Sequence, residues 1–115
     1  MSSDKGGTGH WWGQRLTALA LLFLGLWFLI SLLFLEDLHF AAVSAWLGQP
    51  SSSLLMFLTF ATLVYHSNLG VQVIIEDYVH GPSMQGFSLL ANKVAHVILA
   101  VAGLYAVLKI GLGAA

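Results

Sequence analysis

Apolar residues gather in three long runs that polar segments separate. The runs cover about residues 16–35, 51–78 and 87–108, and only the last carries a lysine, Lys93, near its start. About 20 helical residues cross the hydrocarbon core of a bilayer, and each run can supply that length. No run alternates apolar and polar residues as a membrane β-barrel strand does. The pattern predicts an all-α integral membrane protein in which residues 16–115 form a domain of three transmembrane helices.

The segments between the runs have a different character. Residues 1–15 form a polar arm with two tryptophans at its inner end, where aromatic rings favour the membrane–water boundary. Residues 36–50 join the first two runs, and they predict a short interfacial helix anchored by Trp46. Pro50 suits the first position of the helix that follows. Residues 80–86 are rich in turn-forming residues and form the second connection.

Composition supports the membrane interpretation. Hydrophobic residues make up 58% of the chain and charged residues 8%, whereas a soluble domain carries about 25% charged residues. The net charge of −1 provides no basic patch for nucleic-acid phosphates, so no nucleic-acid partner is expected. The absence of cysteine excludes disulfides and thiolate metal sites. The first run is too long for the core of a cleaved signal peptide, so we expect it to stay in the protein.

Lysine and arginine positions predict the orientation of the chain. Lys5 and Arg15 lie in the arm and Lys93 follows the second connection, while Lys109 alone lies on the other side. Positive residues are enriched in cytoplasmic segments. We therefore expect a cytoplasmic N-terminus and an external C-terminus, which puts the Tyr78 end of the second span on the cytoplasmic side.

The second span carries an unusual set of residues on one helical face. At about 100° per residue, Thr62, His66, Gly70, Val73 and Asp77 fall on one stripe. An intramembrane histidine either bonds to a neighbouring helix or serves as a ligand or proton carrier, and both interpretations stay open. Gly70 leaves space beside the imidazole, as a flat macrocycle bound to it would need, although small residues also serve plain helix packing. For a ligating imidazole, the Thr62 side chain or its backbone carbonyl, one turn back, is a candidate acceptor for the other ring nitrogen.

Other polar residues allow more than one interpretation. Asp77 and Tyr78 could be a solvated helix end and an interface anchor. His96 in the third span could bind a metal within this chain or pair with a polar group of a partner, and His80 could simply be hydrated. No phosphate-binding loop or nucleophile–base arrangement occurs, so we expect no catalytic machinery in this chain alone.

The spacing of His66, Gly70, Asp77 and Tyr78 resembles the signature of the smaller hydrophobic membrane anchor of succinate dehydrogenase (succinate:quinone oxidoreductase, respiratory complex II). The segment "GHWWGQRLTA" (residues 9–18) is similar to the N-terminal pattern of that family. The resemblance extends over nearly the whole chain. The histidine to Asp-Tyr spacing is its most specific part, because three apolar spans alone are generic.

The resemblance implies a role for each matching residue. His66 would be an axial ligand of haem b, and the second membrane anchor of the complex would supply the other ligand. Tyr78 would donate a hydrogen bond to ubiquinone, Asp77 would support that site, and Arg15 would lie near the haem propionates. A chain of 12.4 kDa with three helices could not enclose a porphyrin alone, which agrees with a divided site.

The resemblance further implies an anchor in the bacterial inner membrane that docks the flavoprotein and iron–sulfur subunits and shares the site where electrons reach ubiquinone. Two other functions remain open from the sequence. One is a structural anchor that binds no haem. The other is a stand-alone transporter component or assembly factor in which His66 and Asp77 relay protons.

Overall fold

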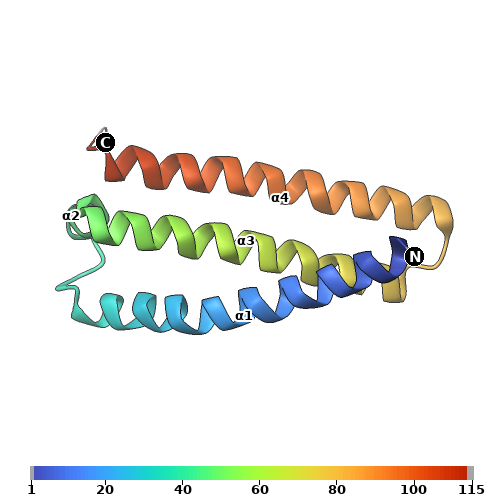
Figure 1. The fold of residues 1–115 in the computed structure, drawn as a ribbon. Coiled ribbons are helices and arrows are strands. Elements are labelled where there is room, and N and C mark those ends of the chain that lie inside the picture. The colour runs from blue at the N-terminus through green and yellow to red at the C-terminus, as the bar shows by residue number, and fades with distance from the viewer. Residues whose placement is uncertain (1, 114–115) are drawn as a thin grey trace.

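The computed structural model describes the backbone of residues 2–113 and the side chains of residues 9–113. Four helices follow one another: α1 (Ser2–Phe34), α2 (Phe40–Gly48), α3 (Pro50–Tyr78) and α4 (Pro82–Gly111). Residues 2–113 contain no strand, so the all-α prediction is confirmed. The three long helices lie side by side, and α3 packs against both α1 and α4 (Figure 1).

Three of the helices are long and apolar enough to cross a membrane. The qualifying segments are Gly9–Phe34, Pro50–Tyr78 and Pro82–Gly111, of 26, 29 and 30 residues. At 1.5 Å per residue they are about 39–45 Å long, which exceeds the roughly 30 Å of a hydrocarbon core. The prediction of three transmembrane helices is confirmed, and the chain is a multi-pass membrane protein.

The helix ends differ from the expected limits in two places. Residues 2–15 of the predicted polar arm are the first part of α1, and no proline interrupts the helix before Phe34. Met1 and the side chains of residues 1–8 lie outside the described part of the chain. Helix α4 begins at Pro82, five residues before the apolar run, because proline fits the first turn, where a backbone N–H has no helical partner. The second connection is therefore only residues 79–81.

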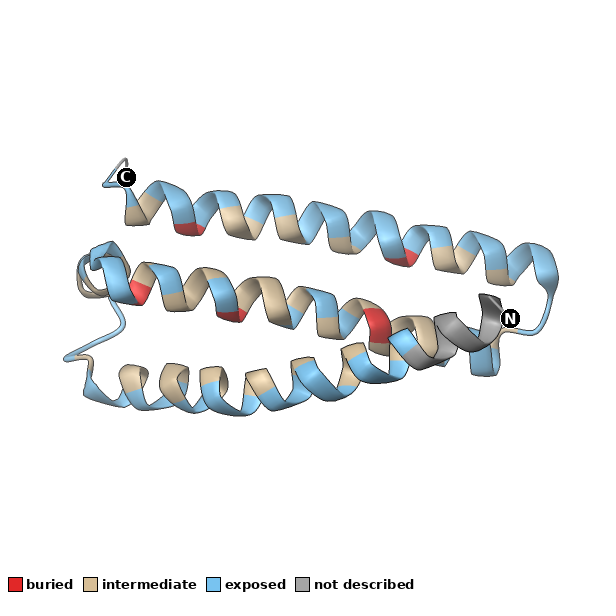
Figure 2. Cartoon of the chain, viewed as in Figure 1, coloured by how far each residue is buried: buried red, intermediate tan, exposed pale blue. Residues whose placement is uncertain are grey.

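The interior of the bundle is small and largely polar. Large apolar side chains are exposed along all three long helices. Few residues of the chain are buried (Figure 2). Lipid is as apolar as leucine, so membrane helices gain more from close packing and interhelical hydrogen bonds than from burying large apolar side chains. The buried residues among those described are Ser52, Thr59, Leu69, Asn92 and Val107.

Glycines allow close contact between α3 and α4. A Cβ atom at Gly103 would overlap the ring of Phe60, and one at Gly111 would overlap Ser53. Both glycines lie on α4 and both neighbours lie on α3. The absence of a side chain at these two positions therefore sets the separation of the two helices.

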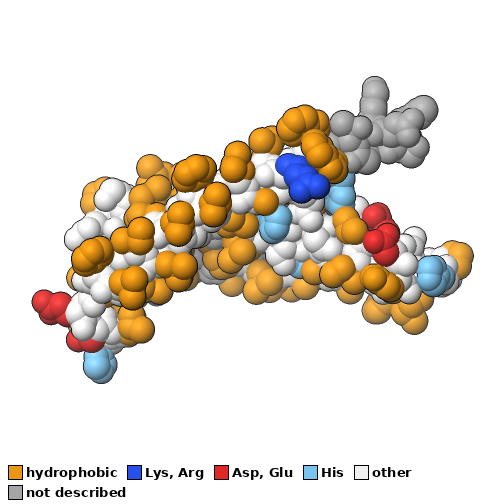
Figure 3. All heavy atoms as spheres, turned by 90° about the horizontal axis from the view of Figure 1, so that it is seen from below, with side chains coloured by type: hydrophobic (Ala, Val, Ile, Leu, Met, Phe, Trp, Pro, Cys, Tyr) orange, Lys and Arg blue, Asp and Glu red, His pale blue; other side chains and the backbone are white. Residues whose placement is uncertain are grey.

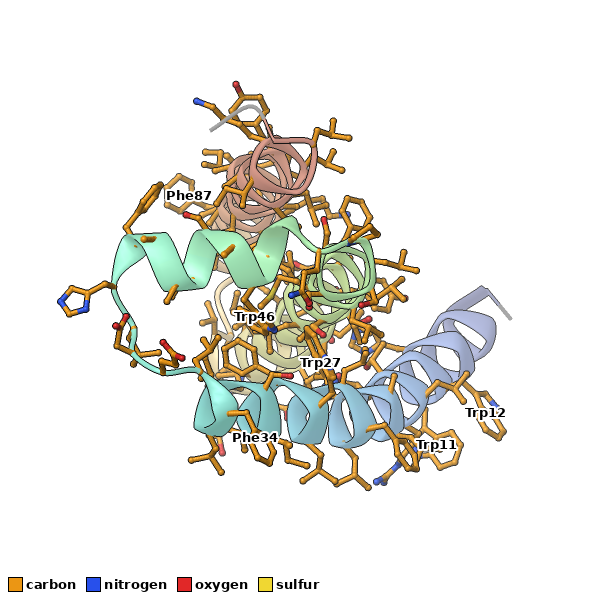
Figure 4. The ribbon with its side chains drawn as sticks, turned by 90° about the vertical axis from the view of Figure 1, so that its left-hand side faces the viewer. Trp11, Trp12, Trp27, Phe34, Trp46 and Phe87 are labelled. Atoms are coloured by element: carbon orange, nitrogen blue, oxygen red, sulfur yellow. The ribbon has the colours of Figure 1, made fainter. Side chains whose placement is uncertain are left out.

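The predicted short helix in the first connection is confirmed as α2, which lies across one end of the bundle (Figure 4). Its Trp46 ring stacks on Trp27 of α1, with the ring centroids 5.7 Å apart. Trp46 is thus half-buried against α1, where the sequence predicted an interface anchor. An aromatic stack between the two helices accounts for this inward orientation.

Candidate functional site

An open cavity of about 520 Å³ lies between α1 and α3. Arg15 of α1 and His66 of α3 both line it, so the structure brings together two residues that the sequence singled out separately. On the face viewed in Figure 3, which is otherwise mostly hydrophobic, a basic side chain lies close to histidine side chains. The cavity is lined by His10, Trp11, Gln14, Arg15, Ala18, His66 and Val73.

His66 is held by a hydroxyl from the neighbouring helix. Its Nδ1 lies 2.8 Å from Thr17 Oγ1, and Thr17 Oγ1 donates to the Gly13 carbonyl oxygen over 2.5 Å. A hydroxyl has one hydrogen to donate, so Thr17 can only accept from His66 while it donates to Gly13. This arrangement fits the tautomer with the proton on Nδ1 and a lone pair on Nε2. Within residues 9–113, Nε2 makes no hydrogen bond.

The hydrogen-bond partner of His66 Nδ1 in the structure is Thr17 of α1, and neither the Thr62 side chain nor its carbonyl, the candidates from the sequence, bonds to the His66 ring. Thr62 lies one turn from His66 on the same helix, whereas Thr17 is 49 residues away in the chain. Helical periodicity within one segment identifies neighbours on that segment only.

Gly13 allows α1 and α3 to approach at this point. A Cβ atom there would lie 2.9 Å from Leu69 Cδ1 and 3.2 Å from the hydroxyl of Tyr65. Leu69 is buried, so it has little room to move away. At Gly70, the glycine that the sequence placed beside His66, a Cβ atom would have ordinary contact, 3.6 Å from Gln14 Nε2. Gly13 matters more than Gly70 for the distance between the two helices.

The N-terminal end of the cavity is polar. Arg15 is exposed, and its guanidinium carbon lies 5.3 Å from the centre of the Trp11 ring. His10 Nε2 and Gln14 Oε1 are buried and have no hydrogen-bond partner among the described residues. A buried polar atom without a hydrogen-bond partner costs free energy of folding. Ala18 and Val73 make other parts of the lining apolar.

Asp77 and Tyr78 lie outside this cavity, at the C-terminal end of α3. The Tyr78 side chain is 76% exposed and makes no hydrogen bond within residues 9–113. Twelve residues of helix put it about 18 Å along the axis from His66. Asp77 and His80 are also exposed. The structure thus separates two candidate sites, one in the bundle at His66 and one at the helix end.

Gln85 holds the turn beside Tyr78, a role that nothing in the sequence pattern indicated. Its Nε2 donates to the Val79 carbonyl over 2.9 Å and to the Glu76 carbonyl over 3.5 Å. The last carbonyls of a helix have no helical partners, so a side-chain amide there stabilises the end of α3. Asp77 and Tyr78 therefore lie at a helix end that the hydrogen bonds of Gln85 stabilise.

Both ring nitrogens of His96 are occupied by this chain. His96 Nδ1 lies 2.9 Å from the Asn92 carbonyl oxygen, which only accepts, so Nδ1 carries the proton. Ser67 Oγ lies 3.0 Å from Nε2 and is its donor. Asn92 also donates to the Asn68 side chain over 3.0 Å, which extends this polar contact between α3 and α4. His96 is a packing residue here, in contrast to His66 with its free Nε2.

Thr17 and Gly13 are site residues that were not expected from the sequence. A signal for them was present, because Gly9, Gly13 and Thr17 are small residues spaced four apart on one helical face. That spacing is typical of close helix contacts in membranes.

Comparisons with known proteins agree with the resemblance carried by His66, Asp77 and Tyr78. The family model for the succinate dehydrogenase/fumarate reductase transmembrane subunit matches residues 1–110. The succinate dehydrogenase hydrophobic membrane anchor subunit of Rickettsia bellii is 31% identical over 105 residues, which are 91% of this chain and 84% of that protein.

Two further relatives come from other organisms. The succinate dehydrogenase membrane anchor subunit of Reclinomonas americana is 32% identical over 93 residues, 78% of each chain. The hydrophobic membrane anchor subunit of Paracoccus denitrificans is 27% identical over 114 residues, which are 99% of this chain and 88% of that protein. No solved structure gives a significant match. Since the family model covers nearly the whole chain, the chain belongs to the family of succinate dehydrogenase/fumarate reductase transmembrane subunits.

Proposed function

We propose that this membrane anchor contributes an axial ligand to haem b through His66 and part of a ubiquinone site through Tyr78. It would join electron transfer from the iron–sulfur subunit to quinone. Two observations carry the haem proposal: His66 lines a cavity of about 520 Å³, and its Nε2 makes no hydrogen bond within residues 9–113. Neutral imidazole with its other nitrogen hydrogen-bonded is the usual state of a metal-ligating histidine.

The residues around the cavity fit a haem. A volume of about 520 Å³ is within the range of small-molecule sites, roughly 300–1,000 Å³. Arg15 can pair with a propionate, and the unpartnered atoms of His10 and Gln14 lie at the same polar end. Ala18 and Val73 can contact the apolar part of the macrocycle. When bound, haem b supplies a one-electron redox centre.

The site is incomplete within this chain. The cavity is open, and in the apolar 18-residue stretches that define the spans of α1, α3 and α4 only 0%, 11% and 6% of the residues are buried. His96 is engaged by Ser67 and Asn92, so it does not supply a second iron ligand. A second membrane anchor would bring that ligand and cover the open side. The soluble iron–sulfur and flavoprotein subunits complete the proposed complex.

Tyr78 and Asp77 suit a quinone site at the membrane surface. The phenol ring tolerates an apolar boundary, and its hydroxyl can donate to a quinone carbonyl. The exposed Tyr78 hydroxyl has no internal partner among the described residues, so it is available for a ligand. Asp77, also exposed, can hold a cationic side chain of a partner or accept protons near the quinone.

We expect the N-terminus in the cytoplasm and the C-terminus outside the bacterial inner membrane. Three spanning helices put the two ends on opposite sides, and the lysine and arginine positions favour this direction. The side of the membrane on which each terminus lies can be measured with reporter fusions. Each end is fused in turn to a reporter that is active only in the cytoplasm and to one that is active only outside. Signals from the same side for both ends would mean that one of the three helices does not cross.

The reduced-minus-oxidised absorption spectrum of the purified complex tests the proposed function. We expect a b-type band that requires co-expression of the second anchor, because each anchor would supply one ligand. Assembly of the soluble subunits without the band would indicate a structural anchor that binds no haem. Absence of both the band and the soluble subunits would indicate a stand-alone membrane protein.

A further inference from the structure

A chain of two hydrogen bonds connects α3 to the backbone of α1. His66 Nδ1 lies 2.8 Å from Thr17 Oγ1, and the Thr17 hydroxyl donates to the Gly13 carbonyl over 2.5 Å. A carbonyl oxygen can only accept, so the single hydroxyl hydrogen of Thr17 is donated to Gly13. With that hydrogen used, Thr17 Oγ1 can only accept a hydrogen bond from His66. The Thr17 side chain therefore recognises one form of the imidazole, the one with its proton on Nδ1.

We propose that Thr17 is a positioning residue that holds His66 as the Nδ1–H tautomer and turns its Nε2 lone pair toward the cavity. An imidazole on a single helix can rotate about two side-chain torsions, and a bond to a second helix removes that freedom. The statement about the tautomer stands on contacts within this chain. The statement about haem affinity rests on the proposed function.

The hydroxyl also affects how strongly Nε2 donates electrons. A hydrogen bond from the far ring nitrogen raises the basicity of a ligating imidazole. The Thr17 hydroxyl is a better acceptor because it is itself donating to Gly13, since linked hydrogen bonds polarise one another. None of the acidic residues in the described part of the chain lines this cavity, so a neutral hydroxyl takes the place that a carboxylate often holds.

The contact depends on the close approach of α1 and α3 at Gly13. A Cβ atom there would press on Leu69 and Tyr65 of α3. Gly13 thus has two parts in the arrangement: its missing side chain admits α3, and its carbonyl orients the Thr17 hydroxyl.

The first test measures the tautomer directly, without haem. Nitrogen-15 NMR of histidine-labelled full chain in detergent micelles separates the two neutral tautomers, and the His66→Ala variant assigns the His66 signals. We expect the Nδ1–H form in the unmodified chain and a mixture of both forms in Thr17→Val, which keeps the side-chain shape. Thr17→Ser should restore the Nδ1–H form. Thr62→Val, the matched control one turn from His66, should change nothing.

The second test uses the assembled complex and measures haem directly. We expect Thr17→Val to lower haem affinity by roughly 10-fold to 100-fold, as loss of such a supporting hydrogen bond does. The midpoint potential of the haem should rise, since a less basic imidazole stabilises the ferric state less. Thr17→Ser should restore both values, and Thr62→Val should leave them unchanged.

An Nε2–H tautomer in the unmodified chain would overturn the inference, as would a Thr17→Val complex with unchanged haem affinity and potential. If Thr17→Val does not assemble, the tautomer of the unmodified chain still decides. Failure of the proposed function has a different signature, namely no b-type band in the unmodified complex while His66 still shows the Nδ1–H form.

Discussion

Replacing His66 with alanine is expected to remove the b-type absorption band from the assembled complex. The reason is that a methyl group provides no ligand for the iron, and His96 cannot replace it. Both His96 nitrogens are bonded within this chain, to the Asn92 carbonyl and to Ser67. The measurement is a reduced-minus-oxidised spectrum of the purified complex, normalised to the amount of its soluble subunits.

Two control variants make the result specific to His66. His80→Ala changes an exposed histidine at the end of α3 and should keep the full band. His96→Gln changes the other intramembrane histidine while preserving hydrogen-bonding capacity, and it should also keep the band. An unchanged band and potential in His66→Ala would rule out this residue as a ligand. Loss of the band in His96→Gln alone would transfer the assignment to α4.

Replacing Tyr78 with phenylalanine is expected to lower ubiquinone reduction by about tenfold or more. The substitution keeps the ring and removes only the hydroxyl. A hydrogen bond to an oxygen that gains negative charge contributes roughly 1.5–3 kcal/mol, and about 1.4 kcal/mol corresponds to tenfold in rate. The hydrogen bond strengthens as the quinone oxygen is reduced. Its loss should therefore lower the rate of quinone reduction more than the affinity for quinone.

Succinate-driven reduction of a water-soluble dye at the soluble subunits should stay normal in Tyr78→Phe, as should haem content and assembly. Tyr105→Phe is the matched control, because Tyr105 is 65% exposed and lies toward the other end of the bundle. It should leave ubiquinone reduction unchanged. Equal turnover and inhibitor sensitivity in Tyr78→Phe and the unmodified complex would leave Tyr78 as an interface anchor only.

The hydrophobic pattern was sufficient to predict the three long helices, but it could not place their ends. An apolar run marks the part of a helix that is suited to lipid. The helix itself can continue beyond that run, until a capping or proline residue ends it. Residues 2–15 therefore continue α1, and Pro82 starts α4 ahead of the apolar residues. Capping and proline geometry act on the backbone and leave little trace in hydropathy.

The candidate residues His66 and Arg15 were predictable, while the contact that orients His66 was not. Periodicity along α3 pointed to Thr62, but the bond comes from Thr17, across a helix contact that only the tertiary structure defines. The Gly9, Gly13 and Thr17 spacing indicates that α1 has a close-packing face. This spacing does not indicate which helix packs against that face, or at which position along the helix axis the contact lies.

The aromatic pairs at the two ends of the α1 span have an optical consequence. All four tryptophans of the chain are paired: Trp11 with Trp12, edge to face at 4.9 Å, and Trp27 with Trp46, stacked at 5.7 Å. Indoles at such separations couple electronically, so their transitions give an exciton signal in circular dichroism. The two rings of a pair also do not fluoresce independently of each other. The Trp27–Trp46 signal exists only while α2 lies against α1, as Figure 4 shows. The chain therefore carries its own spectroscopic probe of folding at that end of the bundle.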